Sequence, residues 1–413
     1  MKRVAITGFG VLSPIGETSR SFWHALKEAR SGIDRISRFD CSGFAVQLAG
    51  EVRHQPALPP DVARVADQDP KVGFAYSACA QALAAAGIQH LDSQTALHLG
   101  TSLEIFDLAE LTCDPQRGLF GMADPSAVRL DRPLQIPLDT AARLISAHFG
   151  RPGAMLTNCS ACAASAQAIG HGFRAVRSGR FQVAVCGGFD SMINPLGVGG
   201  FQLLGALTTD NERGPSACRP FDASRSGTVL GEGAAVVVIE PLEKARAEGK
   251  QVLAEICGYG SSLDAHGLTA PDPEGNGAAR AMLAALEDAG IGADAVGHIN
   301  AHGTGTRLND QVEAMAIRRV FDGFWQHIPV SATKSVAGHL IGAAGALEVG
   351  ACLLPLIEGI IPLNPWLRNV GSGCELAHVT GAAVMLDRGY VLSNSFGFGG
   401  QNATLILRRP DEQ

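Results

Sequence analysis

The pattern of hydrophobic and polar positions distinguishes two kinds of segment along the chain. Short runs of consecutive apolar residues, such as residues 234–239, predict strands that are covered on both faces. Longer alanine-rich stretches at residues 71–86 and 276–289 predict helices, and each is followed by a glycine suited to the position after a helix C-terminus. Strands that alternate with helices in this way predict an α/β fold.

A pattern in the first half of the chain is repeated in the second half. Residues 5–10 (AITGFG) resemble residues 255–260 (EICGYG), and both look like a strand that runs into a glycine turn. In both halves a Gly-Thr pair lies 13 residues after the glycine that ends the alanine-rich helix, namely Gly100-Thr101 and Gly303-Thr304. Any α/β protein gives some such matches by chance, but the shared order and equal spacing predict a duplicated unit.

The length also predicts two halves in close contact, because 413 residues exceed one ordinary domain. A charged helical connector at residues 241–249 marks the boundary between them. Residues 1–245 then form the first half and residues 246–413 the second. Equivalent loops of the two halves are expected to lie beside one shared cleft.

The composition excludes several classes of protein. The net charge is -7 and no block of five or more Lys or Arg occurs, which argues against nucleic-acid binding. No apolar run approaches the roughly 18 residues that span a bilayer, so no membrane insertion is expected. The ten cysteines are scattered and form no disulfide framework, which indicates a reducing cytoplasm.

Cys162 follows a predicted strand at residues 154–157 and precedes a nearly apolar helix at residues 163–178. A thiol at a helix N-terminus meets the positive end of the helix dipole and unpaired N–H groups, which favour the reactive thiolate. From the local sequence alone, an inert buried cysteine is an equal alternative. The pair Cys159-x-x-Cys162 also permits a redox or metal site. The chain is far longer than a redox domain, however, and has no second Cys-x-x-Cys pair.

Two histidines of the second half would face Cys162 across the cleft. His302 follows a strand expected at residues 296–300, and the small residues of its HGTGT sequence suit a place that a ligand approaches closely. His339 lies between a strand expected at residues 328–332 and a helix at 341–357, and a helix start keeps the imidazole neutral. A lone histidine is usually structural, so neither argues for catalysis by itself.

A glycine-rich loop, Gly397-Phe398-Gly399-Gly400, lies near the end of the chain. Glycines let the backbone approach an oxyanion closely, so its N–H groups could act as donors. By itself this loop is a weak signal.

Together these segments resemble the elongating β-ketoacyl-(acyl-carrier-protein) synthases of the thiolase superfamily. The resemblance covers nearly the whole chain, from VAITG at residues 4–8 to NSFGFGG at 394–400. It includes the sequences RPFD at 219–222, GEGA at 231–234, NAHGT at 300–304 and TKSVAGH at 333–339. A Cys-His-His set, not Cys-His-Asn, is the pattern of the elongating enzymes. The resemblance implies the thiolase fold, an α/β fold with a duplicated five-layered αβαβα architecture.

The resemblance also implies a reaction. Cys162 would take an acyl chain from acyl carrier protein. His302 and His339 would support decarboxylation of a malonyl group and stabilise the enolate, which then attacks the acyl-Cys162 carbonyl. Lys334 would organise the histidines electrostatically, with support from Glu348. The N–H groups of Cys162 and Phe398 would form the oxyanion hole, and Phe398 would also act as a gate.

Further expectations concern substrate and partners. By the resemblance, Thr304, Thr306 and Thr269 would bind the phosphopantetheine arm, and Gly399 would contact the substrate. Leu103 would lie near the acyl pocket and the dimer interface. The partners implied are acyl carrier protein and a second subunit, in a homodimer or a heterodimer with a chain-length-factor-like chain. Neither a metal nor any cofactor is required beyond the phosphopantetheine of the carrier.

The chain departs from the family pattern at several positions. Gln401 stands where the family commonly has Thr, and TSLEIF at residues 101–106 replaces a glycine-rich run. Gly205 stands where relatives often have an Arg that would contact the carrier. Arg129 and Arg132 are alternative basic contacts, or solvated surface residues. These changes favour a specialised secondary-metabolism synthase over a housekeeping one.

Two other functions remain possible on the sequence. A non-catalytic chain-length-factor-like subunit would not need the nucleophile and both histidines that this chain retains. A degradative thiolase would have a second catalytic cysteine near the C-terminal glycine loop, and the neighbourhood of Phe398 has none.

Overall fold

A ten-stranded mixed sheet forms the centre of the computed structural model, which describes residues 1–103, 105–106, 111–114, 118–122 and 135–410. Five of its neighbouring strands come from the first half of the chain. In sheet order these are β1 (Val4–Leu12), β12 (Gly233–Pro241), β10 (Val183–Asp190), β4 (Thr95–Thr101) and β9 (Ala154–Cys159). Along this set the pairings are antiparallel, antiparallel, parallel and parallel.

The other five strands come from the second half and repeat this arrangement. In sheet order they are β13 (Ala254–Leu263), β19 (Gln401–Arg408), β18 (Tyr390–Gly397), β14 (Val296–Asn300) and β15 (Val330–Ser331). Their pairings follow the same sequence of directions. The two sets meet where β1 pairs with β13. The predicted duplication is thus confirmed, whereas the division at residue 245 stays a prediction.

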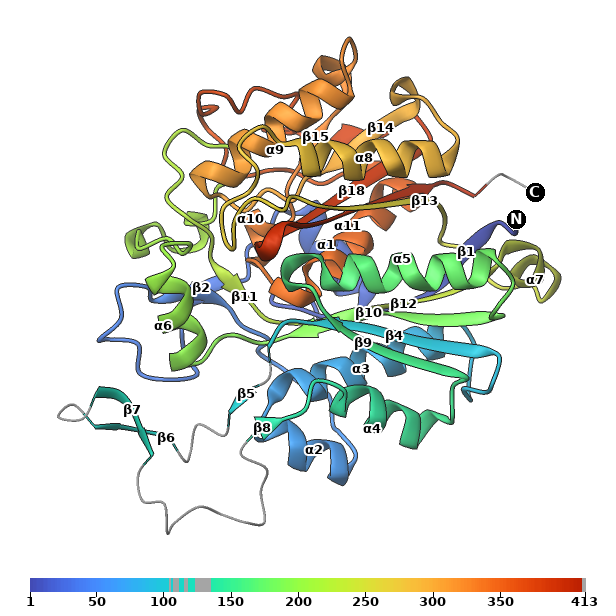
Figure 1. Ribbon diagram of the computed structural model, residues 1–413, viewed down its shortest axis with the longest axis horizontal. Helices are drawn as coiled ribbons and strands as arrows, with labels where there is room; N and C mark the ends of the chain where they lie inside the picture. The colour runs from blue at the N-terminus through green and yellow to red at the C-terminus, as the bar shows by residue number, and fades with distance from the viewer. Residues whose placement is uncertain (104, 107–110, 115–117, 123–134, 411–413) are drawn as a thin grey trace.

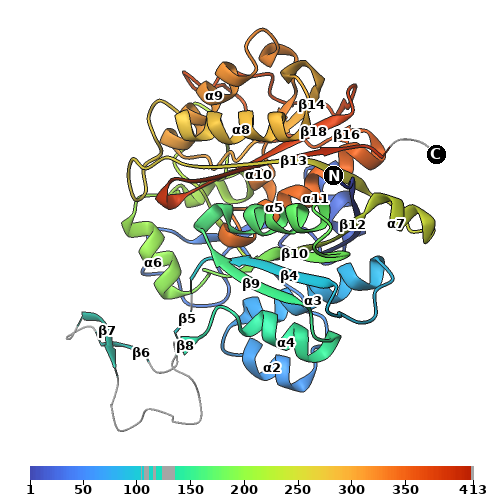
Figure 2. The same ribbon diagram turned by 45° about the vertical axis from the view of Figure 1, so that its right-hand side comes forward.

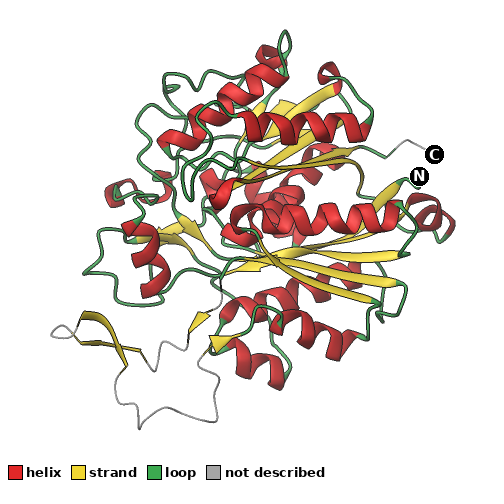
Figure 3. Ribbon diagram, viewed as in Figure 1, coloured by secondary structure: helices red, strands yellow, loops and turns green. Residues whose placement is uncertain are grey.

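Helices lie on both outer faces and between the two sets of strands, which gives five layers (Figures 1 and 3). One outer layer holds α2 (Pro60–Ala66), α3 (Pro70–Ala85) and α4 (Thr140–Phe149). The middle layer holds α5 (Ala164–Arg177) and α11 (Ala344–Glu358), and the other outer layer holds α8 (Asn276–Ala289) and α9 (Arg307–Val320). The predicted α/β architecture of five layers is therefore confirmed, and Figure 2 shows the same layers from a second direction.

Smaller elements surround this body. The helices are α1 (Ser19–Lys27), α6 (Pro195–Leu203), α7 (Leu242–Ala247) and α10 (Lys334–Ala337). A three-stranded sheet joins β2 (Ile33–Arg35), β3 (Leu48–Gly50) and β11 (Leu230–Gly231). Two-stranded pairs are β5 (Ile105–Phe106) with β8 (Gln135–Ile136), β6 (Leu111–Asp114) with β7 (Gly118–Met122), and β16 (Ile360–Ile361) with β17 (Val384–Met385).

Equivalent glycines explain the sequence similarity of β1 and β13. The strand register shifts between Ile6 and Gly8 in β1, and again between Ile256 and Gly258 in β13. A Cβ on Gly8 would lie 2.2 Å from a backbone oxygen of α3, and one on Gly258 would lie 2.3 Å from a backbone oxygen of α8. Only glycine therefore lets each outer helix pack this closely on its strand.

The expectation that no apolar run approaches the length of a membrane span is wrong. Residues Ile341–Glu358 form a helical stretch of 18 residues with a mean hydropathy of 1.6, so the stretch is long and apolar enough to cross a membrane. In the described part of the chain it is the one such stretch, and 89% of it is buried within the protein. Because α11 belongs to the middle layer, with helices and strands around it, packing in the core accounts for its apolar character.

Candidate active site

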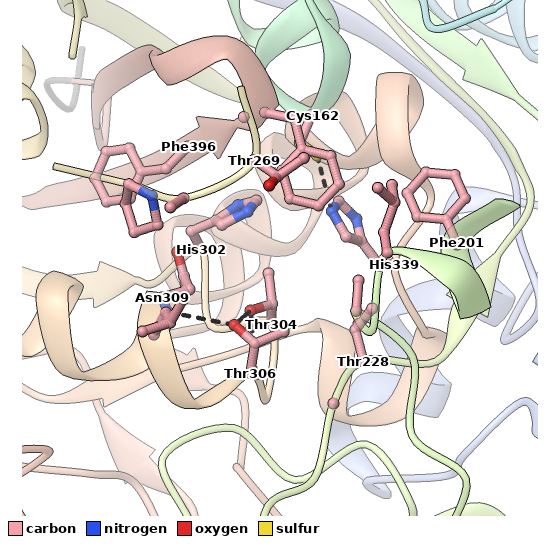
Figure 4. Close-up of a pocket in the computed structure, with 18 of the residues that line it drawn as sticks. Cys162, Phe201, Thr228, Thr269, His302, Thr304, Thr306, Asn309, His339 and Phe396 are labelled. Carbon is pink, nitrogen blue, oxygen red and sulfur yellow. Dashed lines mark hydrogen bonds between the residues drawn. The ribbon is translucent and has the colours of Figure 1, made fainter. Parts of the chain in front are cut away.

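Three side chains meet at the junction of the two halves, as Figure 4 shows. Cys162 belongs to the first half, and His302 and His339 belong to the second. His339 Nε2 lies 3.1 Å from Cys162 Sγ, and the centroids of the two imidazole rings are 5.3 Å apart. All three residues are buried. The structure therefore brings together the three residues that the sequence predicted to meet.

A tight turn places Cys162 at the junction. The sequence predicted it immediately before a helix, but it lies in a 3-10 turn at Ala161–Ala163 that precedes α5. Ala161 has a φ of 47°, a left-handed conformation that costs a residue with a Cβ about 1–2 kcal/mol. The Asn158 side-chain amide stabilises this turn, because it donates to Ser160 Oγ at 2.9 Å and to the Ala164 carbonyl at 3.0 Å.

Hydrogen bonds fix the tautomer of His339. The backbone N–H of Ile341 donates to His339 Nδ1 at 3.2 Å. Because Nδ1 accepts this bond, the proton of the neutral ring is on Nε2, the atom that faces Cys162. Burial lowers the pKa of His339 well below its usual value, and the charge of Lys334 lowers it further. The ring is therefore neutral, as predicted, but mainly because it is buried and not because it precedes a helix.

Lys334 fixes the tautomer of His302, which, like His339, carries its proton on Nε2. Its Nζ donates to His302 Nδ1 at 3.2 Å and to the His302 carbonyl at 2.6 Å, and it forms a close ion pair with Glu348. Burial, followed by the charge of Lys334, lowers the pKa of His302 well below its usual value. His302 is thus a neutral donor through Nε2. Burial also raises the pKa of Glu348 to about 7, although Lys334 opposes this shift.

A second buried carboxylate supports the loop of His302, and sequence reasoning missed it. Glu313, on α9, accepts the backbone N–H groups of His302 and Gly303, both at 2.8 Å. Burial raises the pKa of Glu313 to about 7, and these two hydrogen bonds oppose the shift. The signal available in the sequence was an acidic residue in the helix that follows the HGTGT sequence.

The expected thiolate at Cys162 is not supported. Burial raises the pKa of the Cys162 thiol to about 11, although the charge of Lys334 and a hydrogen bond from the Phe398 N–H oppose this effect. The helix that follows the residue does not offset the loss of water around the sulfur. In the resting protein the group is therefore a thiol at neutral pH.

The protonated state of the Cys162 thiol has a measurable consequence for alkylation of the free protein. The rate at which iodoacetamide modifies Cys162 should rise about tenfold per pH unit between about pH 7 and pH 9, because the thiolate fraction rises by that factor below the pKa. Mass spectrometry of the intact protein would follow the reaction, with Cys162→Ala as the background. A rate that levels off below about pH 8 would contradict the raised pKa.

The glycine-rich loop lies beside Cys162. A Cβ on Gly397 would lie 3.1 Å from the Cys162 backbone nitrogen, so the loop packs against the turn of Cys162. Phe398 begins a 3-10 turn at Phe398–Gly400, and its ring stacks on Phe201 of α6 with centroids 6.2 Å apart. The loop thus combines an N–H donor beside the sulfur with an aromatic side chain at the cavity.

A cavity of about 380 Å³ opens onto Cys162. Predicted substrate contacts that line it are Thr269, Thr304 and Thr306. Gly399 does not line it, and its N–H instead donates to the Leu268 carbonyl at 2.7 Å. Leu103 does not line this cavity either; it is 58% exposed, and its carbonyl accepts from Lys71. Its expected place near the acyl pocket and the dimer interface stays a prediction. Lining residues that the sequence did not single out include Phe201, Thr228, Asn309, Phe396 and Asn402.

The expected contacts at Arg129 and Arg132 lie outside the described residues.

Cys162, His302 and His339 are the one group of three or more potential metal ligands in the described part, with ligand atoms within 4.8 Å of one another. This donor set suits zinc in principle. The Lys334 ammonium that contacts His302 would repel a dication there, however, so the site does not fit a resident metal.

The chain is similar throughout its length to known proteins. Residues 1–245 match the family described as "Beta-ketoacyl synthase, N-terminal domain", and residues 253–367 match "Beta-ketoacyl synthase, C-terminal domain". The 3-oxoacyl-[acyl-carrier-protein] synthase 2 of Coxiella burnetii is 38% identical over 99% of each chain.

Solved structures share the fold. The ishigamide ketosynthase/chain length factor superposes with a TM-score of 0.87 at 34% identity, over 99% of each chain. A ketosynthase solved in complex with its type II PKS acyl-carrier protein, and bound to a hexaketide, gives a TM-score of 0.86 at 25% identity. That match covers 99% of this chain and 100% of the other.

Proposed function

Because the chain belongs to the β-ketoacyl synthase family, we propose that Cys162, His302 and His339 divide that family's reaction between them. The protein is a β-ketoacyl-(acyl-carrier-protein) synthase with the thiolase fold, and thus an acyltransferase. It takes an acyl group from acyl carrier protein and condenses it with malonyl-acyl carrier protein, with loss of CO2, in fatty acid or type II polyketide elongation.

In the first half-reaction, Cys162 Sγ attacks the carbonyl carbon of the acyl thioester. A new S–C bond forms, the bond to the pantetheine sulfur breaks, and the thiol proton passes to the departing sulfur. The negative oxygen of the intermediate is placed between the N–H groups of Cys162 and Phe398. The contact of the Phe398 N–H with the sulfur supports this assignment.

In the second half-reaction, the malonyl thioester oxygen accepts hydrogen bonds from His302 Nε2 and His339 Nε2. These donors stabilise the enolate that forms when CO2 leaves. The enolate carbon attacks the acyl-Cys162 carbonyl, and Cys162 leaves as the thiolate. One observation carries the proposal, namely that the Nδ1 atoms of both rings are occupied by fixed donors, from Ile341 and Lys334. Burial lowers the pKa of both histidines, which favours the neutral rings that this role needs.

In this proposal the pantetheine arm lies along the threonines of the cavity. Thr304 and Thr306 have hydroxyl oxygens 3.0 Å apart, and Thr269 lines the same cavity. Thr304→Val should raise the KM for a pantetheine thioester about 2- to 10-fold with little change in kcat, because one hydrogen bond to the arm is lost. Thr380→Val, at an exposed position outside the cavity lining, is the matched control. A lower kcat with unchanged KM would count against this contact.

A second subunit is proposed to pair along β9. This strand is at one edge of the ten-stranded sheet and exposes Met155 (46%) and Leu156 (38%). An edge strand with exposed apolar side chains favours pairing with another chain. Met155→Lys should therefore convert a dimer to monomers in light scattering, and an unchanged mass would refute the interface. The partner is a second copy or a related chain-length-factor-like subunit, with acyl carrier protein as the transient partner.

The protein is further proposed to work in the cytoplasm without any cofactor besides the carrier's phosphopantetheine.

The decisive test of the function is mass spectrometry of the intact protein after incubation with a panel of acyl carrier proteins. A mass increase confined to Cys162 would identify the accepted chain. If no acyl group is added from any carrier, with or without a related subunit present, the chain is a non-catalytic subunit instead.

A further inference from the structure

A buried ionic cluster lies in the first half of the chain and takes no part in the reaction described above. It consists of Asp69, Lys71 and Asp190, which are each at most 2% exposed. Lys71 Nζ lies 3.5 Å from Asp69 Oδ2. Burial raises the pKa of Asp190, and the positive charge of Lys71 opposes this shift. Charged side chains are rarely fully buried unless they are paired with other groups.

Asp190 reaches across the junction of the two halves. It is the last residue of β10, and its Oδ2 accepts the backbone N–H of Gly342 at 2.7 Å. Its Oδ1 accepts the N–H of Ser191 at 2.9 Å. Gly342 belongs to the 3-10 turn Ile341–Ala343 of the second half, the counterpart of the turn that holds Cys162.

The turn that Asp190 holds is strained. Ile341 has a φ of 45°, which is a rare conformation for a β-branched residue. Such a conformation persists only where the surrounding contacts impose it. Gly342 is also tightly enclosed, because a Cβ there would lie 2.6 Å from the carbonyl carbon of Thr101 and 2.8 Å from Asp190 Oδ2.

The same strained residue sets the tautomer of His339. The Ile341 N–H donates to His339 Nδ1, and the next N–H along the chain, that of Gly342, donates to Asp190. If the turn relaxed, the Ile341 N–H would turn away from the ring. The ring could then place its proton on Nδ1 and present an unprotonated Nε2 to the cavity, where it could no longer donate to an enolate oxygen.

We propose that Asp190 is a positioning residue for the decarboxylation step, because its carboxylate holds the strained Ile341–Ala343 turn that keeps the Nε2 proton of His339 in the cavity. The inference rests on the proposed function and adds a residue to it. Its proposed action runs through His339, so it concerns the second half-reaction. Besides burial, the charge of Asp190 also raises the pKa of Cys162, so its removal should not slow acyl loading. Acyl loading of Cys162 depends on the separate turn at Ala161–Ala163 and on Phe398.

The test compares the two half-reactions in Asp190→Asn. This variant keeps the side-chain volume, and Lys71 keeps Asp69 as its partner. It retains only one acceptor oxygen for the two N–H groups that Asp190 binds. Malonyl-carrier decarboxylation should fall about 10-fold or more, while acyl loading of Cys162 stays within about threefold of the wild type. An equal loss in both half-reactions, or no loss in either, would overturn the proposal.

A double-mutant cycle with Ile341→Gly separates positioning from simple destabilisation. Glycine adopts the left-handed conformation without strain, so the turn no longer needs Asp190 to hold it. Asp190→Asn should therefore lower decarboxylation less than about threefold in the Ile341→Gly background. Effects that multiply in the double variant would show that Asp190 does not act through this turn.

A measurement on the unaltered protein guards against variants that do not fold. Nitrogen-15 NMR of labelled histidine, assigned with a His339 variant, should show the Nε2–H tautomer of His339 at neutral pH. The Nδ1–H tautomer would overturn the inference. A wild-type protein that neither loads acyl groups nor decarboxylates malonyl carrier would instead refute the proposed function, so the two failures are distinguishable.

Discussion

Cys162→Ala is expected to abolish acyl loading and to lower the condensation rate about 10³-fold or more, because Cys162 is the one cysteine among the described residues that line the cavity. Decarboxylation of malonyl carrier should persist in the same variant. Both histidines keep their partners, since Ile341 and Lys334 do not depend on the thiol. Mass spectrometry of the intact protein and a CO2-release assay would measure the two activities separately.

Cys159→Ala is the matched control, because Cys159 is exposed and lies three residues away in the chain. It should load acyl groups at the wild-type rate. Condensation that continued undiminished in Cys162→Ala would remove the basis of the mechanism. Loss of decarboxylation together with loading would show instead that the substitution had disturbed the site as a whole.

Lys334→Ala is expected to lower decarboxylation about 10²-fold and the free energy of unfolding by about 3 kcal/mol. The stability loss arises because Glu348 is left buried without its partner. The kinetic loss arises because His302 Nδ1 loses the donor that keeps the ring proton on Nε2. Denaturant unfolding and CO2 release from malonyl carrier would measure the two effects.

Lys250→Ala provides the comparison for Lys334. Lys250 also pairs with a buried carboxylate, that of Glu240 at 2.8 Å, but outside the cavity lining. Its loss should leave decarboxylation within about twofold of the wild type, because Glu240 keeps Lys244 as a partner and no catalytic ring is touched. If Lys334→Ala lost stability but kept its decarboxylation rate, the role of Lys334 in orienting His302 would be wrong.

The elements that were predicted best from the sequence are those that end at a residue with a clear structural preference, such as a glycine after a helix. Residues 276–289 were predicted as a helix and form α8 with the same bounds, because Gly290 follows with a φ of 68°. The strand expected at 328–332 is shorter, at Val330–Ser331. Turn formation at Ala161 and Ile341 could not be predicted, since their left-handed conformations are imposed by contacts distant in sequence and not by glycine.

Within the site, residue identity was easier to predict than charge state. Cys162, His302 and His339 were identified from their sequence context, and they do meet. The pKa of Cys162 was expected to fall because a helix follows it, but burial raises that pKa, and burial cannot be judged from neighbouring residues. Gly399 was assigned by resemblance and does not line the cavity, whereas the expected place of Leu103 near the dimer interface stays a prediction.

The arrangement of strands on either side of the β1–β13 pairing has a genetic consequence. One polypeptide provides the sulfur and both rings of a cleft, although they come from opposite halves of that polypeptide. Two inactive alleles, one lacking the sulfur and the other lacking a ring, therefore cannot restore each other when their products co-assemble. Every cleft in such a mixed assembly would lack either the sulfur or one of the rings. Enzymes whose clefts combine residues of two polypeptides differ in this respect.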